Sequence, residues 1–171
     1  GRINVADALS TDVIVVQQGT NSPSVALGSV ENWQTSPITF TLTVQNTGSA
    51  IKDVLSSDGT VQTTDGYKDA YALGDFLTVT PSAFTLDPGA MQTVTVAIDL
   101  TTLGGTPLQP FVEGYVTLHL DGPVDLHVPY TWFLGDWNDF NAADTQYKPL
   151  IDPPNPYMPG WSLSRALYSS H

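Results

Sequence analysis

The chain has 171 residues, of which 17 are Asp or Glu and 5 are Lys or Arg, so its formal net charge is −12, and it has no cysteine. The lack of thiols excludes disulfides, thiolate zinc sites and a cysteine nucleophile, and the shortage of Lys and Arg disfavours nucleic acid and anionic bilayers as partners. The length suits one ordinary domain with flanking material, and no apolar run reaches the roughly 18 residues of a membrane-spanning helix.

Residues 1–10 begin with "GRINVADAL", in which apolar residues recur near helical spacing. The pattern predicts a short helical remnant that is too short to be stable alone. We interpret residues 1–10 as the end of a preceding domain or a linker. Because residue 1 is Gly rather than Met, we expect the chain to be a piece of a longer protein.

From residue 11 the hydrophobic period changes to two. "PITFTLTVQNTGSA" and "MQTVTVAIDL" alternate apolar residues with Thr or Gln, as half-buried strands do. "TDVIVVQQG", "FLTVTP" and "AFTL" add shorter strands between Gly, Pro, Asn and Asp turns. About seven or eight strands at this spacing predict an all-β fold, an antiparallel β-sandwich over residues 11–137.

The last two predicted strands lie in "FVEGYVTLHLDGPVDLHVPYTWFLGDW". A hairpin centred on Pro123 would place His119 opposite His127 and both imidazoles on the polar face, with Trp132 pointing inward. The Cβ atoms of such a pair are about 5 Å apart, which makes His119 and His127 candidate metal ligands. A zinc site needs three or four converging ligands, and the ordinary alternative is an exposed pair on a solvated sheet face.

The next segment, "DWNDFNAAD", offers oxygen ligands for calcium from Asp136, Asn138 and Asp139. An EF-hand loop would require Gly and Glu where Asn141 and Tyr147 stand, so only a non-standard calcium loop or a polar turn fits. "SSDGTVQTTDGYKD" at residues 56–69 is interpreted as a polar loop with the same two alternatives.

Residues 138–171 contain Pro149, Pro153, Pro154, Pro156 and Pro159 and show no sustained periodicity. Proline removes backbone donors and fixes φ, so this part is predicted to be an extended proline-rich linker rather than sheet.

The sequence contains no G-x-S-x-G nucleophile motif and no glycine-rich phosphate loop. We therefore predict no catalytic residue, no bound cofactor and no enzyme activity for this chain. The four tryptophans raise a different hypothesis, carbohydrate binding on an aromatic platform, which requires Trp33 or Trp161 to be exposed. Packing is the ordinary alternative, because large aromatic side chains are mostly buried.

"FVEGYVTLHL" and "VPYTWFLGDW", with "LTVTPSAFTLDPGAMQTVTVAIDL" and "PITFTLTVQNTGSA" before them, carry a resemblance. Residues 11–137 resemble the fibronectin type III-like domain that follows the catalytic domain in cell-envelope subtilisin-like serine proteases of the lactocepin type. "GRINVADAL" is similar to the last helix of a subtilisin-type catalytic domain. The resemblance implies a fibronectin type III-like, immunoglobulin-like sandwich.

The resemblance also implies a role. The chain would be a non-catalytic accessory domain of an extracellular or cell-surface protease, with the catalytic triad outside it. Its partners would be the catalytic domain of the same polypeptide and a protein substrate. Glu113 is a candidate docking residue, with an ordinary surface charge as the alternative. The alternative function is an adhesion or carbohydrate-binding module.

Overall fold

The computed structural model describes residues 11–64, 70–103 and 110–134, all within one compact unit, Gly1–Gly135. These residues form ten strands and no helix, which confirms the all-β prediction and exceeds the seven or eight strands expected. The three-residue β7 falls within the predicted strand "AFTL", whereas β2, β4 and the three-residue β5 were not predicted as strands. The strands are β1 (Val13–Gln17), β2 (Val25–Val30), β3 (Ile38–Asn46), β4 (Lys52–Thr64), β5 (Ala70–Ala72), β6 (Leu77–Thr80), β7 (Phe84–Leu86), β8 (Met91–Ile98), β9 (Phe111–Leu120) and β10 (Leu126–Leu134).

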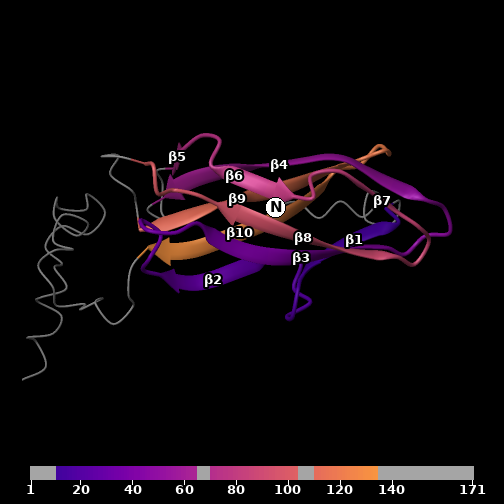
Figure 1. Cartoon of the computed structure of the whole chain (residues 1–171), viewed down its shortest axis with the longest axis horizontal. Coiled ribbons are helices and arrows are strands. Elements are labelled where there is room, and N and C mark those ends of the chain that lie inside the picture. The colour runs from indigo at the N-terminus through magenta and orange to yellow at the C-terminus, as the bar shows by residue number, and fades with distance from the viewer. Residues whose placement is uncertain (1–10, 65–69, 104–109, 135–171) are drawn as a thin grey trace, which may run out of the picture. The chain divides into compact units, whose positions relative to one another are not determined.

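The strands form two sheets that pack as a sandwich (Figure 1). One sheet has four strands in the order β1-β3-β8-β6, and the other has six, in the order β2-β10-β9-β4-β5 with β7 paired to β4. The pairing is antiparallel except between β2 and β10, which run parallel. This parallel pair is an exception within the predicted antiparallel sandwich. The chain changes sheets between β1 and β2, and β2 meets β10 from far away in sequence, so no hairpin fixes their relative direction.

Alternation fills the core as predicted. Ile38, Phe40, Leu42 and Val44 of β3 are buried, and the threonines between them lie on the opposite face. In β8 the alternate positions from Val94 to Ile98 are fully buried. The ring of Phe40 meets that of Tyr130 in the other sheet at a centroid distance of 5.8 Å. The two apolar faces therefore close on each other, as in sandwiches whose sheets lie about 10 Å apart.

The same alternation places Asn46, the last residue of β3, on the inner face, where it is fully buried. Its Nδ2 donates to the carbonyl oxygens of Ala50 at 2.7 Å and Leu86 at 3.0 Å, and its Oδ1 accepts from the Gly48 amide at 2.9 Å. A buried amide must be hydrogen-bonded to be tolerated. Asn46 thus ties the turn after β3 to the end of β7.

The hairpin of β9 and β10 has a register that differs from the predicted one by two residues. Leu126 pairs with Leu118 and His127 with Thr117, so His127 does not face His119 as expected. The connection occupies residues 121–125, and the cross-strand pairs are centred on Gly122 rather than on Pro123. A shift of two residues leaves each side chain on its own face. The predicted inward face, including Trp132, is therefore confirmed.

The predicted polar loop at residues 56–69 is wrong for its first nine positions, because β4 runs through Thr64. Val61 is buried in the core, and Gly59 lets β4 lie close to β9, since a Cβ at Gly59 would stand 2.5 Å from the Tyr115 carbonyl oxygen. Ser, Thr and Gly dominate this strand and conceal its period. Asp58 thus projects from a strand, whereas residues 65–69 lie outside the described part.

The predicted helical remnant at 1–10 and the proline-rich extension at 138–171 also lie outside the described residues. The boundaries drawn there stay predictions. In the part that the structure describes, no helix has the length and apolar character needed to cross a membrane.

Candidate functional site

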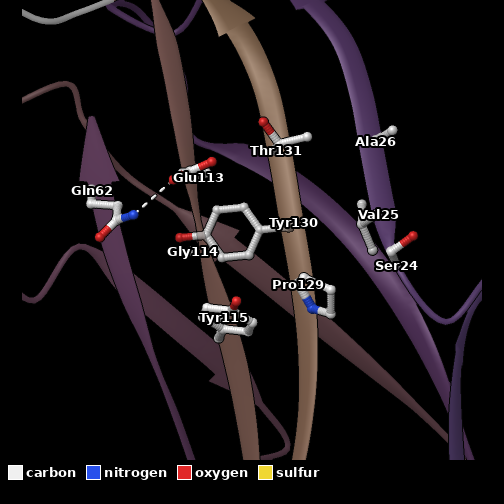
Figure 2. Close-up of a pocket in the computed structure, with 10 residues that line it drawn as sticks. All are labelled: Ser24, Val25, Ala26, Gln62, Glu113, Gly114, Tyr115, Pro129, Tyr130 and Thr131. Carbon is white, nitrogen blue, oxygen red and sulfur yellow. Dashed lines mark hydrogen bonds between the residues drawn. The ribbon is translucent and has the colours of Figure 1, made fainter. Parts of the chain in front are cut away.

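Two rows of side chains cross the outer face of the six-stranded sheet at the middle of β9. Gln62, Glu113, Thr131 and Ala26 stand side by side in one row through the registers of β4, β9, β10 and β2. In the next row Tyr115 lies between Thr60 of β4 and Pro129 of β10. A hollow of about 270 Å³ opens among these rows and is also bordered by Ser24 (Figure 2).

Glu113 is half-buried on β9, which lies between β10 and β4 and is therefore not an edge strand. Gln62 Nε2 donates to Glu113 Oε1 at 2.8 Å, the dashed contact in Figure 2. This hydrogen bond joins β4 and β9 and fixes the direction of the carboxylate. The sequence-based prediction of Glu113 as a docking residue is not tested by this geometry, which shows only how the side chain is held.

Tyr115 is 50% exposed, a high value for a large side chain at the middle of a sheet. The ring of His127 meets the Tyr115 ring edge-on, with centroids 6.4 Å apart and planes at 84°. The Tyr115 amide also donates to Thr60 Oγ1 at 3.2 Å. The ring is thus supported on one side and open to solvent on another, which is the arrangement of an aromatic contact residue.

Gly114 and Tyr130 line the same hollow, with the Tyr130 ring extending toward Gly114 in Figure 2. The Tyr130 hydroxyl donates to the Thr60 carbonyl oxygen at 2.6 Å. Burial raises the pKa of this hydroxyl well above its ordinary value, so it stays protonated and remains a donor. A side chain at position 114 would block this contact, which links β10 to β4 across β9.

His119 lies between two carboxylates further along the same face. Its Nε2 is 3.1 Å from Asp58 Oδ2 and its Nδ1 is 3.0 Å from Asp125 Oδ2. These hydrogen bonds, that to Asp58 first and that to Asp125 second, raise the pKa of His119. A protonated ring donates from both nitrogens, so it keeps no lone pair for a metal.

The structure does not bring His119 and His127 together as a metal-binding pair. His127 Nδ1 lies 3.1 Å from Oγ1 of Thr117, the residue directly opposite His127 on β9. Within residues 11–64, 70–103 and 110–134, no group of three or more His, Cys, Asp or Glu is placed to hold a metal ion. The calcium candidates Asp136, Asn138 and Asp139 lie outside the described residues.

Neither of the two tryptophans that the structure describes forms the exposed platform that a carbohydrate module was expected to show. Trp33 is half-buried against the core and Trp132 is 1% exposed, while Trp161 lies outside the described part. Tyr115 is the aromatic that the sequence-based interpretation missed. Its place two residues after Glu113 on an alternating strand was the available signal. Gln62 gave no signal, because its strand was interpreted as a loop.

The family model described as "Fn3-like domain" matches residues 25–131. The chain belongs to the Fn3-like domain family. The matched range covers β2 through most of β10 and lies inside the predicted domain at 11–137. The recognition of an Fn3-like domain and the predicted fold class are therefore confirmed. No curated protein matches the sequence.

The chain is only distantly similar to solved structures. The PapD-like domain 7 of human CEP192 is 13% identical, with 72% of this chain and 85% of that chain covered and a TM-score of 0.48. The CsuC–CsuE chaperone and tip adhesion subunit complex of Acinetobacter baumannii is 11% identical, with 73% and 53% covered and a TM-score of 0.49. A protein of unknown function from Porphyromonas gingivalis is 12% identical, with 71% and 47% covered and a TM-score of 0.49.

Proposed function

We propose that this Fn3-like domain is a non-catalytic accessory module of an extracellular subtilisin-like serine protease. In this role it braces the catalytic domain of the same polypeptide and contributes to substrate recognition. The observation that carries the proposal is the β9–β10 hairpin. Its sequence supports the resemblance to the lactocepin-type domain, and its outer face bears the Glu113 and Tyr115 surface.

The chemistry of this face suits contact rather than catalysis. Both ring nitrogens of His119 are taken by carboxylates, so this imidazole has no free nitrogen with which to activate a hydroxyl nucleophile. Glu113, Gln62 and Tyr115 instead form a polar surface with one aromatic ring on a rigid sheet. Interfaces between domains of one chain are moderate in size and rather polar, which fits such a surface.

The test uses the full-length protein that contains this chain, with and without residues 11–134. We expect an upstream catalytic domain with a serine-centred subtilase motif. Deletion should lower its thermal midpoint or change its peptide preference, because a packed neighbour contributes stability that is lost with it. The present chain, purified alone, should hydrolyse no peptide substrate. A reading frame without a protease domain, or a deletion that changes neither property, would contradict the proposal.

A further inference from the structure

We propose that the hollow between Glu113 and Tyr115 receives an arginine side chain of a partner segment. The inference rests on the proposed function, since it gives the chemistry of the docking surface. The partner is a segment of a neighbouring domain of the same polypeptide that presents an exposed arginine.

The first argument is the unbalanced charge of Glu113. Lys52 is the one Lys or Arg among the described residues, and its Nζ is paired with Asp12 Oδ2 at 3.2 Å. Within the described part Glu113 receives its hydrogen bond from a neutral group, Gln62 Nε2. A carboxylate has about four acceptor positions. Its second oxygen therefore remains for a cationic donor, and such charge-assisted bonds are the strong ones.

The second argument is the ring beside the carboxylate. Tyr115 is two residues from Glu113 on the same face, so their Cα atoms are roughly 7 Å apart. A guanidinium group is planar, donates to a carboxylate at its edge and stacks on an aromatic ring through its face. Cation–ring attraction acts within about 6 Å of the ring centroid. One guanidinium between the two side chains can donate to the Glu113 carboxylate and stack on the Tyr115 ring. A lysine ammonium can donate to the carboxylate but has no planar face to stack on the ring.

The third argument is the rest of the lining. Pro129 stands beside Tyr115 and gives apolar surface for the methylene stem of an arginine. Ser24 and Thr131 also line the hollow, Thr131 next to Glu113, and their hydroxyls suit a polar backbone. The net charge of −12 draws cationic groups to the molecule from a distance. A divalent ion is a poorer occupant, because no group of three ligands is placed to hold one in the described part.

The experiment is an NMR titration of the ¹⁵N-labelled chain with a blocked Gly-Arg-Gly peptide. We expect saturable shifts at the amides of Gln62, Glu113 and Tyr115. The peptide with lysine in the centre should bind more weakly. The peptide with citrulline, which has the shape of arginine without its charge, should give no saturable shift. Citrulline binding as tight as arginine binding would overturn the inference.

Glu113→Gln keeps the size of the side chain and should weaken arginine binding roughly tenfold, as expected for loss of one charge-assisted hydrogen bond. Glu31→Gln is the matched control, because Glu31 is exposed and is the other glutamate of the described part. Equal weakening by the two variants would show attraction to net charge only and would overturn the proposal. Tyr115→Leu should weaken arginine binding several-fold more than lysine binding.

A neutral disaccharide, cellobiose, is a further probe. If it shifts the same amides equally in the wild type and in Glu113→Gln, the hollow is a saccharide site and the proposal is wrong. The result is separable from the proposed function. Arginine binding in a chain whose gene encodes no protease would leave the arginine site standing and remove only the accessory role.

Discussion

At Gly114 the backbone of β9 lies close to both neighbouring strands of the six-stranded sheet, β4 and β10. A Cβ there would stand 1.9 Å from the Thr60 carbonyl oxygen and 2.6 Å from the Tyr130 hydroxyl. The first neighbour is backbone, and the second is the hydroxyl of a buried ring that is hydrogen-bonded to the Thr60 carbonyl oxygen, so Gly114→Ala must displace backbone or break the Tyr130 hydrogen bond. We expect a loss of about 3 kcal/mol in unfolding free energy, at the upper end of ordinary overpacking, measured by urea denaturation.

Gly122 provides the control, because a Cβ there meets nothing within 4 Å and its φ is not in the left-handed region. Gly122→Ala should change the unfolding free energy by less than about 0.5 kcal/mol. Equal effects of the two substitutions would mean that Gly114 is not the close-contact point that the structure indicates.

His119 makes stability depend on pH. Its pKa is raised in the folded state by hydrogen bonds to Asp58 and Asp125. The stabilisation is therefore fully present below the unfolded pKa of about 6.5 and is lost as pH rises through the higher folded pKa. His119→Gln should lower the urea midpoint more at about pH 5.5 than at about pH 8.5.

NMR titration of His119 separates the two partners. Asp58→Asn should lower the pKa of His119 more than Asp125→Asn does, because the hydrogen bond to Asp58 is the larger cause of the shift. A His119 pKa that neither substitution lowers would show that the carboxylates do not hold the imidazolium.

At the scale of elements, the sequence predicts best where Thr and aliphatic residues alternate without interruption. β3 and β8 pair directly with each other, and each buries one face, so the period of two is visible without a structure. The same period placed Asn46 inside. The sequence did not show that Asn46 is buried, because asparagine is polar and a turn follows it. Its burial is explained by hydrogen-bond partners such as the Leu86 carbonyl oxygen, 40 positions away in the sequence.

β4 and the hairpin register show why other features could not be predicted. β4 contains Ser, Thr and Gly where a strand is expected to show aliphatic residues. At Gly59 the space of a side chain is taken by the backbone of β9 and by the Leu77 side chain. A shift of two residues in β9–β10 leaves the hydrophobic pattern unchanged. Pattern alone therefore could not choose between a turn centred on Pro123 and the observed connection.

The candidate site was predictable to the same limited degree. Glu113 was singled out as a polar residue suited to contact with another domain, and Tyr115 shares its face by alternation. Gln62 reaches Glu113 only through the register of β4 and β9, which a chain separation of 51 residues conceals. Likewise the two carboxylates that hold His119 come from β4 and from the β9–β10 connection.

At the scale of the whole molecule, charge is distributed unevenly between the two sheets. No Asp, Glu, Lys, Arg or His occurs in the strands of the four-stranded sheet, β1, β3, β6 and β8. The ionisable strand residues of the described part all lie in the six-stranded sheet, and they include Glu113, Asp58 and His119. Recognition of a cationic partner is therefore expected on the six-stranded side, where the hollow also lies.

The excess of acidic over basic residues should make this chain more stable at moderate salt than at low salt. Like charges repel more strongly in the compact state than in the unfolded one, and raising NaCl from about 10 mM to about 300 mM shortens the screening length from roughly 30 Å to less than 10 Å. The salt also weakens the Lys52–Asp12 pair, but with 17 acidic against 5 basic residues the repulsion outweighs this attraction. We expect the thermal midpoint to rise by about 2–4 °C, which corresponds to about 1 kcal/mol for a domain of this size.

Calorimetry at the two salt concentrations measures this rise, and sucrose at matched osmolarity controls for general exclusion effects. The double variant Asp75→Lys and Asp87→Lys reverses two exposed charges outside the strands, so it should reduce the rise while leaving the core unchanged. A midpoint that falls with salt would mean that attractive pairs, foremost Lys52 with Asp12, are stronger than the net repulsion. The acidic surface would then contribute to stability rather than oppose it.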